Sequence, residues 1–562
     1  MDLLGKAMQP EFWQSVREKD CFDRYRKELL DTWDKECKTP IAELPYSDFK
    51  RYFVDGNRSG YENIYFSRRR ALGASALLAL IYPENPEYLD YLMDLTYAIC
   101  NEYTWCLPAH QGALAPNNNS MIDLFASETG FALAEILTLL GDRLESLIQN
   151  RIKAEIDRRI FVPFFPKNSH TDFWELKVHN WAAVCMGSVA CTLMLLRPDL
   201  VDDAAKQRFE ATMATYLSGF REDGICLEGC AYWHYGFGFF TVYADMIRTF
   251  TNGEIDHFKN DKVKMISTFL QKMYVGAPAA VSFADGHREC RYHLGLVHYL
   301  KREYPEDVAA YDSKHSYNHD FCERFCLHLR SALWLSEEYY NAPDSDSDGM
   351  EYYASASEWF VKRTSAYGFA AKGGSNAELH NHNDVGSFIF TKNGRQILVD
   401  LGAGEYTRQY FSSKERYTIL ECSSRGHSVP IIDNTCQYVG GAAYAVGTKY
   451  ENGTFSTDIA NAYACEGLEK LERSFVCSED TVTLTDRFVY HGEGDVIERF
   501  VTLCEPALVR EGMLQVGEAA LIYDPSICDY ELSSEQSTKS GTCYLIDFKL
   551  KKGIDTFVCT LR

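Results

Sequence analysis

Positive charge is scarce in this chain: its 562 residues include 57 Lys and Arg against 80 Asp and Glu, giving a net charge of −23. This balance argues against a nucleic-acid binder, which needs a basic surface, and against docking on an anionic membrane. The longer apolar stretches, such as 71–82 and 131–140, fall well short of the roughly 20 residues of a membrane span. The first residues, MDLLGKAMQPEFWQSV, lack a basic region followed by an apolar one. We therefore expect no secretory signal and a cytoplasmic protein.

Paired cysteine motifs are also missing. The 19 cysteines are odd in number and include no CxxC pair, although Cys226/Cys230 and Cys322/Cys326 have the CxxxC spacing of a helix. This pattern favours reduced, buried thiols over disulfides or a thiolate metal site.

The first 340 residues read as helical, because their apolar residues recur every three or four positions. We expect helices at 71–82, 88–101, 122–140, 181–196, 204–220, 232–250, 263–275 and 320–335. No fixed-period repeat of the solenoid kind is present, so stacked helical hairpins, an array or a toroid are the architectures to consider.

Near residue 340 the pattern changes. The stretch NAPDSDSDG (341–349) reads as a linker, and alternating strands follow at 481–490, 496–504, 544–550 and 555–561. Asn393-Gly394 predicts a tight hairpin turn, and KKGI (551–554) predicts a second one. The C-terminal part is therefore expected to be an antiparallel β-sandwich.

The histidine-rich segment ELHNHNDVG (378–386) is the strongest local signal for chemistry. In an extended chain His380, His382 and Asp384 would share one face. Two imidazoles and a carboxylate form a natural metal or acid–base cluster, whereas the alternative is a polar loop with hydrogen-bonded histidines.

Two further segments, VDLG (399–402) and RGHSVP (425–430), contain Asp400 and His427. Together with His382 these residues could form a zinc-type site of two histidines and one carboxylate. An ideal hairpin turning at 393–394 would place Asp400 opposite Ser387 instead of His382. A bulge near Gly386 or a curved entry loop is therefore required.

Two segments of the helical half contain polar and aromatic candidates. In DGICLEGCAYWHYG (223–236), Tyr232 and Tyr235 are three apart and can share a helix face, although packing between helices would explain them equally. In KVHNW (177–181), His179 and Asn180 open an apolar helix, and a capping role for Asn180 is the alternative.

Taken together these segments resemble the heparinase II/III family of polysaccharide lyases. The resemblance consists of HxHND, VDxG and GHxVP in the β half, and of the Asn-Trp helix start and DGxxxEGxxYWxYG in the helical half. The segments RRR (68–70), WxxPAH (105–110) and SFADG (282–286) add to it, and the match runs in the family's order over about 60 to 435.

The resemblance implies an α+β multidomain fold. An N-terminal (α/α) toroid at 1–340 would be followed by a linker at 341–355 and an antiparallel β-sandwich at 356–562, with the active site between the two domains. It also implies β-elimination next to a uronic acid, leaving a 4,5-unsaturated uronate. Elimination needs a neutralised carboxylate, a base for the C5 proton and an acid for the departing O4.

The resemblance also assigns roles to individual residues. Tyr232 is the implied acid; the base is Tyr232 or His179, and Asn180 and His380 would neutralise the carboxylate. A divalent metal, zinc or alternatively manganese, would be held in a structural role by His382, Asp400 and His427. Tyr235 is the fallback for the acid and a candidate for substrate binding, and the weaker candidates for substrate charges are Arg68, Arg70, His110, Arg288 and Arg425.

Glycosaminoglycans such as heparan sulfate, chondroitin and hyaluronan are the expected substrates, with alginate oligosaccharides next, and a homodimer is the family-level expectation. Two alternatives stay open. One is a glycoside hydrolase using two carboxylates, for which Asp223 and Glu228 are the available acids, and the other is a non-catalytic glycan-binding protein.

Overall fold

The computed structural model describes residues 3–112, 114, 121–165, 172–290, 292–309, 320–342 and 349–562. The chain forms two compact units, which we call the helical unit and the β unit. The helical unit contains 1–219, 233–267 and 291–345, and the β unit contains 220–232, 268–290 and 346–562. Two segments from the first 340 residues, 220–232 and 268–290, thus belong to the β unit.

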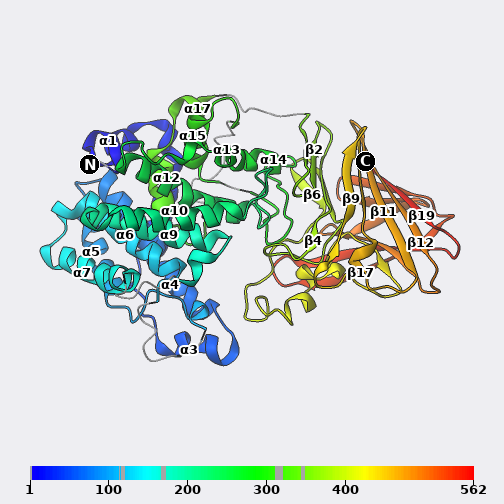
Figure 1. Cartoon of the computed structure of the whole chain (residues 1–562), viewed down its shortest axis with the longest axis horizontal. Helices are drawn as coiled ribbons and strands as arrows, with labels where there is room; N and C mark the ends of the chain where they lie inside the picture. The colour runs from blue at the N-terminus through cyan, green and yellow to red at the C-terminus, as the bar shows by residue number, and fades with distance from the viewer. Residues whose placement is uncertain are drawn as a thin grey trace. The chain divides into compact units, whose positions relative to one another are not determined.

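The α-helices lie before residue 342 in the part of the chain coloured blue to green in Figure 1. In the helical unit they are α1 Pro10–Glu18, α2 Asp23–Glu36, α3 Tyr46–Asp55, α4 Ser59–Ile81, α5 Pro86–Cys100, α6 Leu124–Leu140, α7 Ser146–Ile156, α8 Val162–Phe164, α9 Asn180–Leu196, α10 Asp203–Ser218, α12 Gly238–Phe250, α13 Asp261–Ser267, α15 Leu294–Glu303, α16 Phe325–Leu333 and α17 Glu337–Asn341. The short helices α11 Cys230–Tyr232 and α14 Phe269–Met273 belong to the β unit.

Helix α6 shows how local signals and burial act together. Asp123 caps it by accepting a hydrogen bond from the Ala126 amide at 2.7 Å, and the helix packs against α9. By length and composition alone, Leu124–Arg143 could cross a membrane, but 72% of its most apolar window is buried inside the protein. That burial is typical of a core helix.

Most predicted helices are confirmed, and three are interrupted. The helix expected at 232–250 contains a π-helix at Trp233–Phe237 before α12. The helix expected at 263–275 is split into α13 and α14, and the one expected at 320–335 begins only at Phe325. Glu323 has φ 48°, a left-handed conformation that a helix cannot contain.

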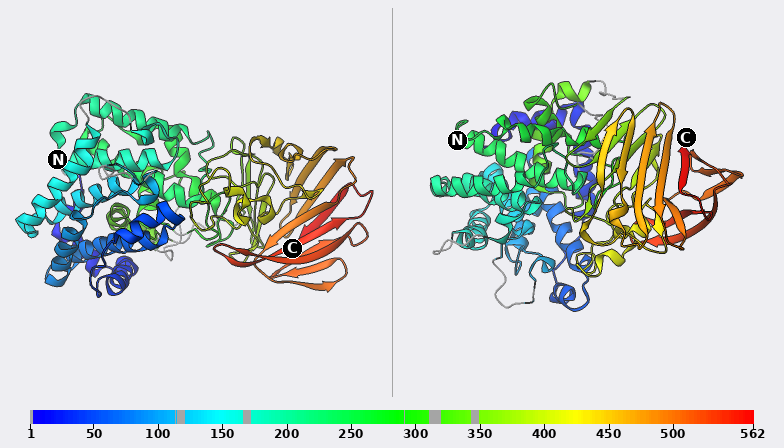
Figure 2. Two further views of the ribbon diagram at one scale, coloured as in Figure 1. Left: turned by 90° about the horizontal axis from the view of Figure 1, so that it is seen from below. Right: turned by 45° about the vertical axis from the view of Figure 1, so that its right-hand side comes forward.

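The β unit holds antiparallel sheets, as expected. The eight-stranded sheet has the order β14 Pro506–Arg510, β15 Met513–Val516, β16 Ala519–Tyr523, β19 Thr556–Leu561, β12 Val482–Tyr490, β11 Leu468–Cys477, β10 Thr454–Asp458 and β9 Val446–Glu451 (Figure 2). The five-stranded sheet is β1 Glu351–Ala354, β2 Trp359–Arg363, β3 Gly368–Lys372, β5 Phe388–Lys392 and β6 Arg395–Leu398. The four-stranded sheet is β17 Cys528–Ser537, β18 Gly541–Leu550, β13 Val496–Thr502 and β7 Ile431–Ile432, and β4 Ser375–Asn376 pairs with β8 Gly440–Tyr444.

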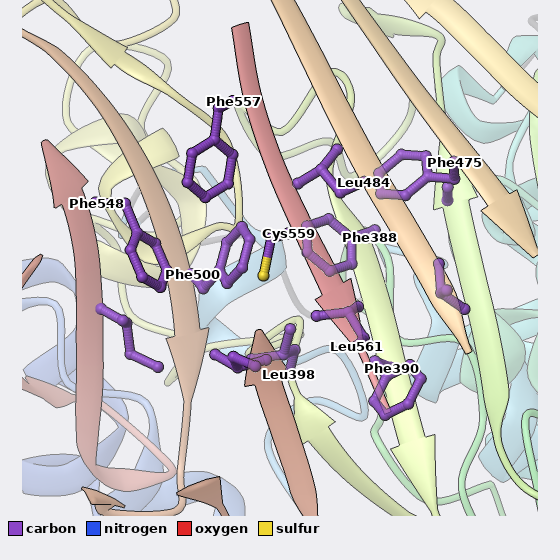
Figure 3. Packing of buried hydrophobic residues seen from close by; sticks show 14 of the residues in the cluster. Phe388, Phe390, Leu398, Phe475, Leu484, Phe500, Phe548, Phe557, Cys559 and Leu561 are labelled. Atoms are coloured by element: carbon purple, nitrogen blue, oxygen red, sulfur yellow. The ribbon is translucent and has the colours of Figure 1, made fainter. Parts of the chain in front are cut away.

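A single hydrophobic cluster joins these sheets. Phe388 of the five-stranded sheet packs on Phe475 of the eight-stranded sheet and on Phe500 of the four-stranded one, with ring centroids 5.1 and 5.4 Å apart (Figure 3). The sandwich predicted from alternation is therefore a set of sheets that share a large apolar core, with two smaller clusters beside it. Helices followed by antiparallel sheets are confirmed, whereas closure of the helices into a toroid stays a prediction.

The predicted turns are present, with one correction. Asn393 and Gly394 have φ 47° and 71°, as a tight hairpin between β5 and β6 requires. The turn at 551–554 also forms, with Ile554 donating to the Lys551 carbonyl. It does not close a hairpin, because β18 and β19 belong to different sheets. Of the predicted linker 341–355, residues 343–348 lie outside the described residues, and β1 occupies its end.

Arg473 of β11 is the one arginine among the largest fully buried side chains of the described residues. Its guanidinium pairs with Asp486 at 2.6 Å and Glu498 at 2.9 Å, and all three side chains are fully buried. The same group donates to the carbonyls of Gly386 at 2.9 Å and Ser428 at 2.8 Å. It therefore connects the core of the eight-stranded sheet to the two loops that carry His382 and His427.

Candidate active site and metal centre

The carboxylate of Asp285 is the centre of a polar cluster inside the β unit. It is 1% exposed and accepts hydrogen bonds from His380 at 2.6 Å, His382 at 3.1 Å, Tyr406 at 3.2 Å and Arg416 at 2.9 Å, and from Tyr410 as well. Burial alone would raise the pKa of Asp285, but the hydrogen bonds from the two histidines hold it well below its usual range. Asp285 is therefore an anion that is stabilised by several hydrogen-bond donors.

Tyr232 and His380, two of the predicted catalytic residues, lie together in this cluster. Their ring centroids are 4.3 Å apart, and the Tyr232 hydroxyl lies 2.9 Å from that of Tyr406. Since Tyr406 donates its proton to Asp285, Tyr232 donates to Tyr406. Burial, and next the Asp285 charge, raise the pKa of Tyr232, so its hydroxyl stays protonated at neutral pH.

His380 has acidic groups near both ring nitrogens. Its Nδ1 donates to Asp285, and its Nε2 lies 3.3 Å from Glu228 Oε2. Burial alone would lower the pKa of His380, but the bond to Asp285 and the two acidic charges outweigh burial and raise it. The ring can therefore be held as a cation.

The extended conformation expected around His380 is wrong. The segment is a turn, and His380 has φ 54°, a left-handed conformation that costs a residue with a Cβ about 1–2 kcal/mol. His380 and His382 consequently meet at Asp285, whereas Asp384 accepts a hydrogen bond from Lys372 at 2.8 Å. Ala284, which precedes Asp285, also has a positive φ of 58°. Strained backbone on both sides of the His380–Asp285 hydrogen bond is typical of functional sites.

The predicted metal ligands do come together. One atom each of His382, Asp400 and His427 lies within 4.8 Å of the others, and all three residues are 0% exposed. The register difficulty is resolved before β5: the bulge in β6, where Phe390 pairs with Leu398 but Thr391 with Gln396, moves the register by one residue only, and His382 lies in the irregular segment outside the ladder. Gly386, with φ 84°, adds the curved entry to β5. This group could therefore hold a metal ion.

The hydrogen bonds around this group leave three atoms available as ligands. His427 Nε2 donates to the Glu421 carbonyl at 2.8 Å, and His382 Nε2 donates to Asp285. Among the described residues, His382 Nδ1 is buried without a hydrogen-bond partner, and His427 Nδ1 and Asp400 Oδ2 lie 3.1 Å from each other and have no other partner. Histidines that donate one N–H to a carboxylate or carbonyl while the other nitrogen stays free are typical of metal sites. The donor set fits a divalent metal.

Removing one of these ligands should abolish metal binding. We expect the metal-free protein to take up one zinc ion per chain and His427→Ala to lose it, because two remaining ligands cannot complete the site. Competition with a chromophoric chelator measures the affinity. His491→Ala is the matched control, since His491 is exposed and lies 3.6 Å from Glu469. Equal zinc affinity in His427→Ala and wild type would contradict the assignment.

His179 and Asn180 belong to the helical unit. The His179 ring caps α9 by accepting from the Trp181 amide at 3.4 Å, so the cap is His179 and not Asn180. Asn180 is 3% exposed, and a Cβ built on Gly236 would lie 3.0 Å from the Asn180 Cβ. Gly236 therefore allows the π-helix to approach the start of α9 closely.

His110 and Tyr235 have partners within the helical unit. His110 Nδ1 bonds Asp123 at 2.7 Å, and its ring packs against Trp181 with 4.8 Å between centroids. Tyr235 donates to Glu128 and lies under the Arg324 guanidinium, 3.7 Å from its ring centroid. Tyr232 and Tyr235 thus have different partners, although they are three residues apart.

Glu128 gives the helical unit a testable pH dependence. Burial, the largest influence, raises the pKa of Glu128 from 4.5 to about 7, although Arg324 and Tyr235 act in the opposite direction. Between these two pH values the folded state keeps a proton that the unfolded chain has released. The free energy of unfolding should therefore fall by about 3 kcal/mol as pH rises through this window. Denaturant titrations across the window should show a smaller fall in Glu128→Gln; an unchanged slope would contradict this prediction.

The predicted arginines differ in how their charge is satisfied. Arg68 pairs with Glu102 at 3.0 Å and Arg70 with Glu36 at 2.8 Å, so both already neutralise buried carboxylates. Arg425 is exposed and forms a long ion pair with Glu535, at 3.7 Å. Arg288 Nη1 is buried without a hydrogen-bond partner among the described residues, which makes Arg288 the best placed of the four to meet an anion.

Sequence reasoning missed most of the Asp285 cluster. Asp285 lies inside the SFADG motif but was not singled out, and Tyr406, Tyr410 and Arg416 lie in a segment without a recognisable pattern. Arg416 also donates to the carbonyls of His380 and Asn381, at 3.1 and 3.3 Å. These residues are missed because their partners are distant in sequence.

Comparison with known proteins supports the resemblance seen in the sequence. Residues 351–524 match the family model described as heparinase II/III-like, C-terminal. The predicted resemblance is thereby confirmed. No curated protein matches the chain significantly.

Solved structures extend the likeness to the whole fold. A mutant of the heparan sulfate lyase HepC from Pedobacter heparinus is 12% identical, with a TM-score of 0.60 over 100% of this chain and 87% of that one. Heparinase III is 12% identical, with a TM-score of 0.58 over 98% and 91% of the two chains. The Streptomyces coelicolor A3 chondroitin AC lyase, solved with chondroitin sulphate, is 11% identical, with a TM-score of 0.57 over 100% and 82%. At such identities these likenesses define the fold.

Proposed function

We propose that this protein is a polysaccharide lyase that cleaves uronic-acid-containing glycans by β-elimination. The observation that carries the proposal is the contact between the rings of Tyr232 and His380 within one cluster, with the Tyr232 hydroxyl linked through Tyr406 to Asp285. Elimination needs a proton donor beside a cationic group, and this pair supplies both. The family of residues 351–524 and the lyases that share the fold support the same reaction.

In the proposed reaction, His380 stabilises the uronate carboxylate as negative charge develops on it. Tyr232 then protonates the departing O4, because its raised pKa keeps the hydroxyl protonated. On one uronate epimer the Tyr232 oxygen takes the C5 proton as its own hydroxyl proton passes to O4, so the hydroxyl is restored when the bonds have broken. On the other epimer His179 takes the C5 proton and later releases it to solvent, and the Tyr232 oxygen regains its proton from water. Tyr406 holds the Tyr232 hydroxyl in place through their hydrogen bond. Bond breaking at C5–H and C4–O4 leaves the C4=C5 double bond.

A divalent metal, with zinc as first choice and manganese as alternative, would be held by His382, Asp400 and His427. When bound, it would supply a fixed positive charge that holds the three ligand segments together. Asp285 contacts both His382 and His380, so the metal site would lie next to the proposed catalytic residues. The role proposed for the metal is structural.

Glycosaminoglycans are the first proposed substrates, and alginate oligosaccharides the second. Incubation with heparan sulfate, chondroitin, hyaluronan and alginate, followed by ultraviolet absorbance of the new double bond, tests the proposal. New reducing ends without that absorbance would instead identify a hydrolase. Neither signal on any of these substrates, with metal-loaded protein, would refute lyase activity toward them.

The hydrolase alternative has weaker support in the side-chain geometry. Both oxygens of Asp223 are bound by Ser357, through its amide at 2.7 Å and its hydroxyl at 2.8 Å. An inverting hydrolase needs a free carboxylate to activate water. Asp223 in this state is a structural group. The carboxylate across the His380 ring from Glu228 is that of Asp285, and its oxygens are already occupied by hydrogen-bond donors.

A further inference from the structure

The segment at residues 282–286 supports three parts of the candidate site at once. Asp285 Oδ1 accepts from His382 at 3.1 Å, while its Oδ2 accepts from His380 at 2.6 Å. The Ser282 hydroxyl donates to the carbonyl of Asp400 at 3.0 Å, and the Gly286 carbonyl accepts from the Ala403 amide at 3.2 Å. The segment 282–286 therefore contacts two metal-ligand candidates, His382 and Asp400, and also the candidate catalytic residue His380.

The two oxygens of Asp285 are joined in one rigid, planar group. Arg416 and Tyr410 also bind Oδ1, and Tyr406 also binds Oδ2, so the carboxylate has little freedom to rotate. Any shift of His382 must therefore move the acceptor of His380, or break a short charge-assisted hydrogen bond.

The same carboxylate sets the protonation of both rings. By accepting from His382 Nε2, it leaves His382 Nδ1 free to act as a ligand. By accepting from His380 Nδ1, it directs Nε2 away from itself, toward Glu228. Which nitrogen of a histidine carries the proton is set by the hydrogen bond that the other nitrogen makes.

We propose that Asp285 is a positioning residue that couples metal occupancy of His382, Asp400 and His427 to the orientation of His380. The coupling rests on contacts within the β unit, and only its consequence for catalysis rests on the proposed function. Because coupling between two sites is reciprocal, binding of metal orders His380, and whatever fixes His380 strengthens metal binding.

Asp285→Asn is the direct test, because the amide keeps the shape but can accept through one atom only. We expect zinc affinity to fall about 10–100-fold, as for other residues that hydrogen-bond to metal ligands. With ¹⁵N-histidine labelling, zinc should shift the His380 imidazole signals in wild type but not in the variant. If wild type is a lyase, kcat should fall in the variant while KM changes little.

Asp547→Asn is the matched control, since it makes the same change at a carboxylate paired with Arg499 elsewhere in the β unit. It should leave zinc affinity and the His380 response to zinc unchanged. If Asp285→Asn does not fold, Tyr410→Phe removes one donor to Oδ1 and should weaken zinc binding to a smaller extent.

Zinc affinity within about threefold of wild type in folded Asp285→Asn would overturn the proposal, since it falls below the expected range. So would His380 signals in wild type that do not respond to zinc. Failure of the lyase proposal looks different: wild type would form no unsaturated product, while the zinc-dependent His380 signals would persist.

Discussion

Replacing Tyr232 with Phe is expected to lower kcat for elimination by about 10²–10⁴-fold, the usual contribution of a general acid or base. The variant loses only the hydroxyl, and the ring can keep its contact with His380 at 4.3 Å between centroids. Without that hydroxyl the departing O4 has no proton donor from this tyrosine, and the hydrogen-bonded row through Tyr406 loses its first member. Initial rates of double-bond absorbance on the best glycan found give the measurement.

Tyr353→Phe is the matched control for this experiment. Tyr353 also loses one hydroxyl hydrogen bond, to the Thr448 carbonyl at 2.9 Å, but it lies on β1 outside the Asp285 cluster. Its kcat should equal that of wild type. A Tyr232→Phe protein with wild-type kcat would remove Tyr232 from the reaction and leave His179 as the candidate.

The second large effect concerns stability. Arg473→Met should lower the free energy of unfolding by about 3–5 kcal/mol, the usual cost of breaking a buried ion pair. Methionine replaces the volume but leaves Asp486 and Glu498 as neighbouring buried carboxylates, and leaves the carbonyls of Gly386 and Ser428 without their donor. Burial, and next the Asp486 charge, already raise the pKa of Glu498 well above its ordinary value while the arginine is present. Urea denaturation at neutral pH measures the loss.

Arg197→Met serves as the control, because Arg197 makes a similar two-pronged pair with Asp199 but on the surface. Exposed pairs contribute only about 0–1 kcal/mol. A similarly small loss of unfolding free energy in Arg473→Met would contradict the prediction. It would mean that Asp486 and Glu498 find other hydrogen-bond donors, or take up protons, at no cost in stability. A loss of the expected size should be accompanied by weaker zinc binding, because Arg473 holds the loops of His382 and His427.

The class of fold could be predicted from the sequence because it depends on local periodicity. Apolar spacing predicted α4, α5, α9 and α10, and alternation predicted β12, β13, β18 and β19. The sheet to which each strand belongs could not be predicted in this way. The turn residues at 551–554 predicted a hairpin because they indicate only the local backbone geometry. Which strand each neighbouring strand pairs with depends instead on how the sheets pack around their common hydrophobic core.

The candidate site, too, contains some residues that could be predicted from the sequence and others that could not. Tyr232, His380 and the three metal-ligand candidates carry recognisable motifs, so they could be named from the sequence. Asp285 could not, because its importance comes from His380 and Arg416, which are 95 and 131 residues away along the chain. The turn that brings His382 to Asp400 lies before β5, outside the ladder of β5 and β6, and no single residue specifies it.

The β unit is assembled from three separate stretches of chain, and this has a practical consequence for producing it alone. A fragment starting at 346 would include every strand but neither Tyr232 nor Asp285. His380, His382, Tyr410 and Arg416 would then face a gap where their common acceptor belongs, with buried donors left unpaired. A stable isolated domain would therefore need residues 220–232 and 268–290 grafted back, for example through short linkers or by co-expression of both pieces.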